Sequence, residues 1–338
     1  MSTSLKLATE RSPITMTALW PALLMLLLVS SAWSLAALAP IGFSIAIVFL
    51  FAGPHNWLEA RYMLQRMPAR WGALWRYFAL GIGGTLLLSG GLAALSLTAR
   101  GGLIGGDGIM LVLSMWNTLL VAWIVTLALL RAGQNPRRHW PWVAPVGLIV
   151  IGLAWIAPLM CSLALVYVHP LMSLWFLDRE LARTRANWHH VYRAMLMALP
   201  LLLVAMWVLL ARSPHLPGDD ILADAITAHA GAGILDGVST HLLVSTHTFL
   251  EMLHYGVWIV AIPSLRLRRW PWQLDDVPLA RRSVAWRRAV LGVVIAGAAV
   301  MLLLWLAFAA DYPLTRDVYF TIATLHVLAE VPFLLRLL

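Results

Sequence analysis

Long apolar stretches separated by short polar connections repeat along the whole chain. A helix needs roughly 20 mainly apolar residues to cross a bilayer, and ten stretches qualify. They cover residues 16–38, 40–60, 74–98, 108–130, 140–156, 158–177, 193–211, 239–264, 289–309 and 317–336. Residues 140–177 also allow one kinked helix followed by a re-entrant segment. The pattern therefore predicts an all-α, polytopic transmembrane helix bundle of about ten spans.

The composition agrees with this class. Of 338 residues, 61% are hydrophobic and 12% are charged. A soluble core cannot hide that much apolar surface, whereas a bilayer solvates the outer faces of helices. We therefore expect a single integral membrane domain over residues 1–338, with the lipid bilayer as its partner. The one cysteine, Cys161, excludes an intramolecular disulfide.

The basic residues predict the topology. With ten spans and a cytoplasmic N-terminus, 21 of the 24 Lys and Arg residues fall on one side, and only Arg100, Arg212 and Arg316 on the other. This bias places both termini in the cytoplasm, and with the short loops it favours a bacterial inner (cytoplasmic) membrane. Many arginines lie beside Trp in short loops, which indicates a membrane interface and not a nucleic-acid partner.

Two connections are long. Residues 212–238 form the predicted external loop, and residues 265–288 the predicted basic cytoplasmic interfacial segment.

Histidine and glutamate lie within several predicted spans, although ionisable groups there are costly to insert. A His and a Glu recur four residues apart, which puts both on one helix face. The three pairs are His55/Glu59, His247/Glu251 and His326/Glu330. His169 and His254 add two further imidazoles.

These residues lie at similar depths. Counted from the next cytoplasmic Arg, the histidines of four spans lie within about 9 Å of a common level. His247, Glu251 and His254 also share one stripe, and Glu251 and His254 have the Glu-x-x-His spacing that holds metals in helix bundles. We expect a metal site with the ligands His55, His169, His247, His254 and His326.

Imidazole with carboxylate suits iron, and also zinc, manganese or copper. Glu59, Glu251 and Glu330 are the candidate catalytic residues, either as further ligands or as acceptors that fix the histidine tautomers. Asn56, Trp57, Tyr255 and Trp258 are expected to line the approach of the substrate. A lone His241 is interpreted as a polar contact to a neighbouring helix. His139, His189, His190, His215 and His229 are interpreted as solvated.

Four motifs resemble the Brp/Blh family of membrane β-carotene 15,15'-dioxygenases. Gly53 to Glu59 is similar to the family's Pro-His-x-x-x-Asp signature, and His169 with Asp178 to its second motif. The segments His247 to His254 and Thr324 to Glu330 are similar to its third motif and its C-terminal segment. The resemblance implies non-haem iron, O₂ as co-substrate and a lipophilic, isoprenoid-like substrate. Carried over by position, the iron ligands are His55, His169, His247 and His254.

The leading hypothesis is therefore a metal-dependent oxygenase or other oxidoreductase with one or two iron ions, acting on a lipid-soluble small molecule. Three alternatives stay open. The His/Glu pairs could carry protons or ions in a transporter, two histidines could ligate haem, or the cluster could be a structural polar network.

Overall fold

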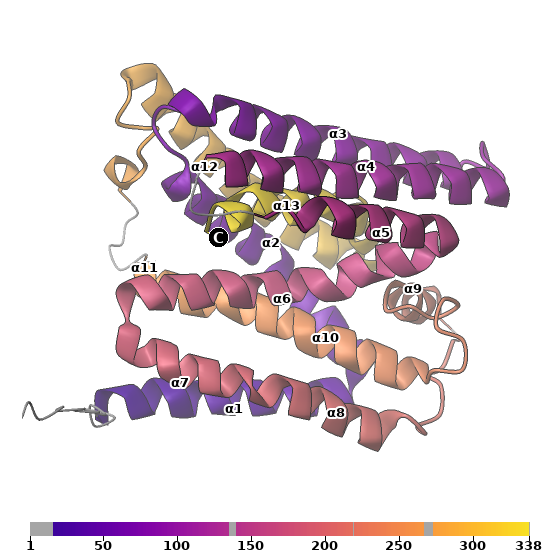
Figure 1. Cartoon of the computed structure of the whole chain (residues 1–338). Helices are drawn as coiled ribbons and strands as arrows, with labels where there is room; N and C mark the ends of the chain where they lie inside the picture. Colours follow the sequence, from indigo (N-terminus) through magenta and orange to yellow (C-terminus); the bar gives the residue numbers. More distant parts are fainter. Residues whose placement is uncertain (1–15, 135–139, 219, 267–272, 338) are drawn as a thin grey trace, which may run out of the picture.

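The computed structural model describes residues 16–134, 140–218, 220–266 and 273–337 (Figure 1). Within these ranges every regular element is helical, so the all-α prediction is confirmed. The long elements are α1 Met16–Leu38, α2 Pro40–Arg66, α3 Trp75–Arg100, α4 Gly106–Gly133, α5 Val143–Ile156, α6 Pro158–Thr184, α7 Ala186–Leu196, α8 Ala198–Leu210, α10 Thr240–Gly256, α12 Val284–Ala310 and α13 Tyr312–Leu337. Short helices α9 Ile221–His229 and α11 Ile262–Arg266 complete the set.

Eight helical segments of the described chain are long and apolar enough to cross a membrane. They are Pro40–Arg66, Gly72–Arg100, Gly106–Gly133, Pro158–Thr184, Ala186–Leu210, Thr240–Leu265, Val284–Ala310 and Tyr312–Leu337. Shorter apolar helices at Met25–Leu38 and Val143–Ile156 occupy the two other predicted ranges. The chain is therefore an integral membrane protein by the length and composition of its helices.

Residues 143–177 belong to two separate helices, and only the second of them is long enough to count as a candidate span. α5 ends at Ile156, and α6 begins at Pro158. Proline suits the first turn because no helical partner is needed there for its missing N–H. α5 has only 14 residues, about 21 Å at 1.5 Å per residue.

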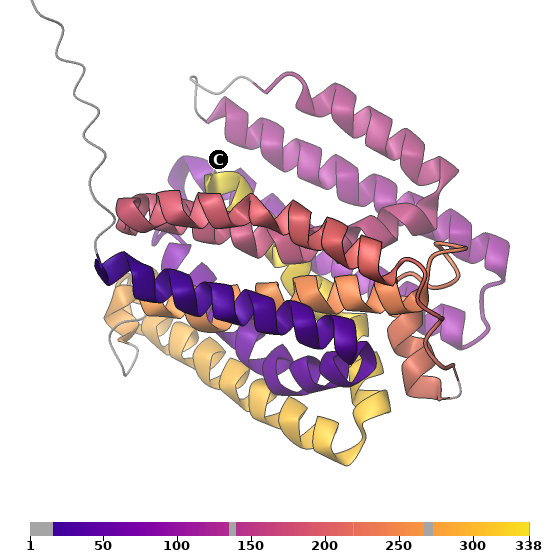
Figure 2. The same cartoon turned by 90° about the horizontal axis from the view of Figure 1, so that it is seen from below.

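Four helices form the centre of the bundle. α10 packs on both α2 and α6, and α13 also packs on both α2 and α6, so the four close a ring. α3, α4 and α5 cover one side of this ring, whereas α1, α7 and α8 cover the other (Figure 1). α12 lies against α2 at the edge seen in Figure 2.

The break between α7 and α8 has a local cause. Pro200 cannot donate to the carbonyl of Leu196, and its ring crowds that carbonyl. The helix is interrupted at Met197, and then continues to Leu210 as a single span-length segment.

The two ends of the bundle differ in charge. The C-terminal ends of α4, α6 and α13 and the start of α7 lie together at the left in Figure 1, and they carry arginines such as Arg131, Arg183 and Arg336. The first turn of α1 lies at this end too. We call it the Arg-rich end. The opposite end carries α9.

The described parts of the two long connections contain short helices and turns. The predicted external loop, 212–238, contains α9, which packs against α2 and α10. In the predicted interfacial segment, 265–288, the described part contains a 3₁₀ turn at Leu274–Asp276, an Arg287–Asp275 ion pair of 3.0 Å and the start of α12. Residues 267–272 of that segment lie outside the described chain.

Candidate metal centre

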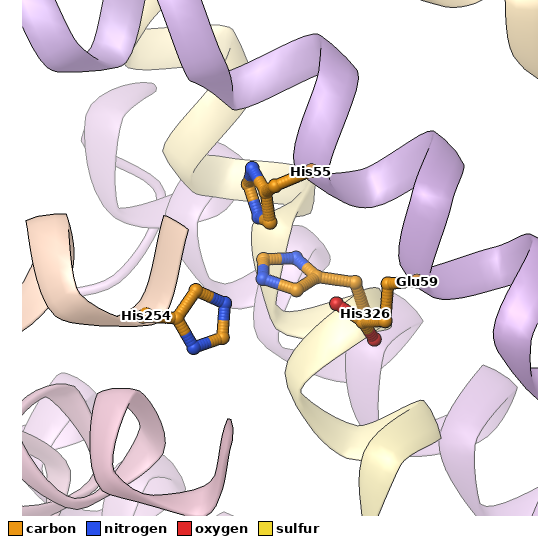
Figure 3. Close-up of side chains that lie close together, drawn as sticks. All are labelled: His55, Glu59, His254 and His326. Carbon is orange, nitrogen blue, oxygen red and sulfur yellow. The ribbon is translucent and has the colours of Figure 1, made fainter. Parts of the chain in front are cut away.

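Three of the central helices bring the predicted residues together at one point. His55 and Glu59 from α2, His254 from α10 and His326 from α13 point toward one another (Figure 3). Each of the four residues offers one nitrogen or oxygen atom that lies within 4.8 Å of those offered by the other three. This set has the donor types and the closeness that a bound metal ion requires.

A second group adjoins the first. His169 from α6, His254 and Glu330 from α13 also place one donor atom each within 4.8 Å of one another. The rings of His169 and His254 are 4.5 Å apart, and those of His169 and His326 are 5.0 Å apart. His254 belongs to both groups, so all four helices of the ring meet at this imidazole.

Several donor atoms of these groups are buried and have no hydrogen-bond partner in the described structure. They are both ring nitrogens of His254, Nδ1 of His169, Oε2 of Glu59 and Oε2 of Glu330. A buried polar atom without a partner costs about 1–3 kcal/mol. Five such atoms at one place indicate a ligand that would satisfy them, and imidazole with carboxylate fits a transition metal.

Two hydrogen bonds orient the cluster. Nδ1 of His55 lies 2.8 Å from the carbonyl of Phe51, so a proton on Nδ1 leaves the Nε2 lone pair free for a metal. The indole N–H of Trp258 donates to Oε1 of Glu330 at 3.1 Å. Such partners hold the donors in place before any ligand arrives.

A proline lies close to a donor in three of the four central helices. Pro54, Pro170 and Pro332 lie inside α2, α6 and α13, within two residues of His55, His169 and Glu330. Proline removes a helical hydrogen bond and frees a carbonyl. Pro332 frees the carbonyl of Leu328, which accepts from Thr85 of α3 at 3.4 Å.

On the fourth helix, a π-helical turn at Val257–Ala261 follows His254 closely. Such turns occur mostly as single-turn interruptions at functional sites. Each of the four central helices thus has either a proline or a π-helical turn near the cluster.

A cavity of about 120 Å³ lies next to the cluster. Its wall includes His55, His169, His254 and His326, and it extends toward the α9 end, where it meets His229, His247, Glu251 and Tyr255. The rest of the wall is mainly apolar, with Leu165, Phe320 and Val327 among its members.

His247 lies outside both groups of donors, in contrast to its predicted place among the ligands. It stands two turns of α10 from His254, and its ring lies 5.0 Å from that of His229 and 5.9 Å from that of Tyr167. Glu251 also lies outside the groups, and its Oε1 accepts from Tyr255 at 2.7 Å. Position on one helix face does not bring residues to one point when they are about 10 Å apart along the axis.

The four residues predicted to line the approach of the substrate lie in different places. Tyr255 lines the cavity, with its ring 4.5 Å from that of His55. Trp57 turns away toward α12, where its N–H donates to the carbonyl of Val294 at 3.1 Å, which does not fit a role at the approach. The side-chain amide of Asn56 donates to the hydroxyl of Tyr319 at 3.2 Å. The indole N–H of Trp258 donates to Glu330.

His229 was interpreted as solvated, and this interpretation is wrong. It lines the cavity from the end of α9, with its ring 4.3 Å from that of Phe320. Burial, His247 and Arg316 lower the pKa of His229 well below its ordinary value. No periodic pattern in a loop could have shown that α9 folds back over the bundle.

Arg316, expected at the external surface, is only 6% exposed and packs over the ring of Phe320.

Other titratable residues have structural roles. His241 bonds to the carbonyl of Ala37 on α1 at 2.8 Å, which confirms its interpretation as a contact to a neighbouring helix. Asp178, part of the family-like second motif, binds Arg193 at 2.9 Å and His189 at 2.8 Å, and so joins α6 to α7. His189 is therefore paired, and His139 lies outside the described residues.

The fold and the cluster together define a class: a polytopic helical membrane protein whose interior His/Glu groups could hold metal ions. Comparisons with models of known protein families, with curated proteins and with solved structures find no match.

Proposed function

We propose that this protein is a membrane-embedded, non-haem iron enzyme that uses O₂ to oxidise a lipid-soluble small molecule. The observation that supports the proposal most is His254. It is buried among apolar helices, belongs to both donor groups, and has no hydrogen-bond partner for either ring nitrogen in the described structure. A bound metal ion would give this buried imidazole the partner that the protein does not supply.

The donor set suggests how metal would be held. His55, His254 and His326 with Glu59 offer three nitrogens and a carboxylate, and His169 with Glu330 adds one of each. One ion would take most of its ligands from the first group; two ions would share His254 between them. Neutral imidazoles and carboxylates suit iron, although manganese, zinc and copper accept similar ligands. The family resemblance of the motifs favours iron.

A bound iron would supply the site for O₂ binding and activation. The chain's own residues would position it: Phe51 fixes the His55 tautomer, and Trp258 fixes Glu330. Tyr255, beside His55 and hydrogen-bonded to Glu251, stands where the substrate would face the centre.

The size of the cavity limits the substrate. A drug-sized ligand usually occupies about 300–1,000 Å³, and this cavity measures about 120 Å³. A long isoprenoid would therefore place only its reacting segment beside the cluster, while the remainder lies between helices or in the bilayer. Access from the bilayer through the helix ring accommodates such a molecule without a large enclosed pocket.

The topology is part of the proposal. Ten spans, with both termini in the cytoplasm, put the Arg-rich end inside, as the positive-inside rule requires. The cavity then extends from the metal centre toward the external end. Short connections and a strong basic bias favour a bacterial inner membrane.

The alternatives fit the geometry less well. Haem needs two axial imidazoles on opposite faces of a porphyrin, each about 2 Å from the metal. Here four rings crowd one point, with centroids 4.5–5.3 Å apart in the contacting pairs His55–His254, His55–His326, His169–His254 and His169–His326. Proton or ion transport has one observation in its favour: Glu59 and Glu330 are both fully buried near each other.

Metal analysis and absorption spectroscopy on detergent-purified protein test the proposal. One or two iron ions per chain without a Soret band, together with O₂ consumption when lipid or carotenoid substrates are added, are the expected results. A Soret band would identify a haem protein. Absence of bound metal after anaerobic iron reconstitution would contradict the proposal and favour pH-dependent flux assays in proteoliposomes.

A further inference from the structure

A second cavity, of about 240 Å³, lies at the Arg-rich end of the central helices. Arg66 of α2, Arg183 of α6 and Arg336 of α13 line it, so three helices each contribute one guanidinium group. None of these residues belongs to the candidate metal centre. The cavity is therefore a separate feature and needs its own explanation.

The charges around the cavity do not balance. Glu180 forms an ion pair with Arg66, and it is the one carboxylate that the described structure pairs with the three arginines. Arg336 donates from Nη1 to the carbonyl of Arg66 at 2.7 Å, and it forms no ion pair with a carboxylate of the described chain. Arg183 is exposed and has no ion pair among the described residues. Among the described residues, two guanidinium charges thus face one small cavity without a paired carboxylate.

The cavity is amphipathic. Its inner wall is made by Phe176 and Phe333, with Tyr62 beside them. Tyr62 packs edge-on against Phe176 and Trp258, and Phe176 packs at a tilt against Trp258. Trp258 in turn donates to Glu330 of the candidate metal centre. An occupant would therefore place an anionic group among the arginines and an apolar part against the aromatic rings.

We propose that this cavity binds a phosphate group, from an anionic lipid headgroup or from a free phosphate-bearing molecule. Guanidinium groups match phosphate oxygens in charge and bidentate geometry. Basic cavities between transmembrane helices at the membrane surface suit lipid headgroups. The proposal is independent of the proposed enzymatic function, because none of its residues holds the metal.

The test compares two probes on the full-length protein in a neutral detergent. Inorganic phosphate and a short-chain phosphatidylglycerol are titrated against the wild type and Gln65→Glu, with binding measured by calorimetry and native mass spectrometry. Gln65 lines the cavity, so the substitution adds a negative charge there and removes no arginine. Gln273→Glu, the same change at an exposed position near the Arg-rich end, is the matched control.

We expect saturable binding that Gln65→Glu weakens at least about tenfold, and that Gln273→Glu leaves unchanged. Arg183→Gln, which breaks no ion pair of the described structure, should also weaken it. Binding of both probes identifies a phosphate site, whereas binding of the lipid alone identifies a headgroup site that needs the acyl chains. No saturable binding of either probe, or equal binding by wild type and Gln65→Glu, overturns the proposal. Thermal melts verify that each variant is folded.

Discussion

Two spans of nearly equal length differ sharply in hydropathy and in how much of each is buried inside the protein. The segment Thr240–Leu265, which contains α10, has the lowest mean hydropathy of the eight span-length segments, 1.3, and 50% of its most apolar window is buried inside the protein. α12 has the highest, 2.7, and only 6% of its window is buried. Hydropathy therefore identifies the helix that faces lipid, and the least apolar segment is the one that contributes His254 to both donor groups.

The cause is the solvent. Lipid solvates any apolar side chain, so most of the α12 surface can face the bilayer. α12 packs closely on α2 where Gly53 lies against Met301 and where Gly297 lies against Trp57. α10 meets protein on most sides, and polar groups can persist there only when neighbouring helices or a ligand satisfy them.

The largest expected effect follows from His254→Ala. Because His254 joins both donor groups, its loss should lower bound metal at least about tenfold and abolish the proposed oxygenase activity. Metal analysis of purified variants measures this. Leu303→Ala, on the lipid-facing side of α12, and His241→Ala, elsewhere on α10, should keep wild-type metal content. Full iron occupancy in His254→Ala would remove the distinction between the two spans.

Glu330→Gln should have a smaller effect. The amide keeps the size of the side chain but loses the charge that faces His169, so metal affinity should fall about 10–100-fold. Competition with a chelator gives the affinity. Glu251→Gln is the control, because Glu251 lies outside both donor groups. Equal losses of metal affinity in the two variants would mean that Glu330 has no specific role in holding the metal.

The pH dependence of stability tests the α9 end. The pKa of His229 is lowered in the folded protein, so below pH ~6.5 the unfolded chain takes up a proton that the folded chain resists. Stability should therefore fall as pH decreases through that range. His229→Asn should lose less stability than the wild type between pH 7.5 and pH 5, as thermal melts at both values would show. Parallel pH profiles would place His229 in contact with water.

The smallest effect is expected for Thr85→Val. It removes the donor to the carbonyl of Leu328 that Pro332 frees, and should lower the free energy of unfolding by about 0.5–1.5 kcal/mol. Denaturation in mixed micelles measures the change. Thr98→Val removes a bond that lies within α3 alone and should matter less. If Thr98→Val lowers the free energy of unfolding by as much as Thr85→Val, the hydrogen bond between α3 and α13 does not contribute specifically to stability.

Much of the fold followed from the sequence, because lipid requires a long apolar run for each span. Each of the ten predicted ranges contains an apolar helix, and the common depth of His55, His169, His254 and His326 correctly indicated that they meet. Spacing along a helix sets the face and the depth of a residue. It does not set how the helices rotate and tilt, which decides that His326 joins the cluster and His247 does not.

Other features depend on tertiary structure. A loop helix that folds back over the bundle brings His229 to the cavity, and packing on Phe320 buries Arg316. The π-helical turn after His254 arises where α10 fits between α2 and α6, and no residue pattern in that segment distinguishes it from a regular helix.

The single cysteine offers one position for a spin label at a known distance from the cluster. Cys161 lies in α6, eight residues before His169 and only partly buried, which is about 12 Å along the helix axis. A nitroxide attached there would need no cysteine to be removed first. Its relaxation would respond to a paramagnetic ion at the cluster, so electron spin resonance could follow the arrival of metal in intact membranes.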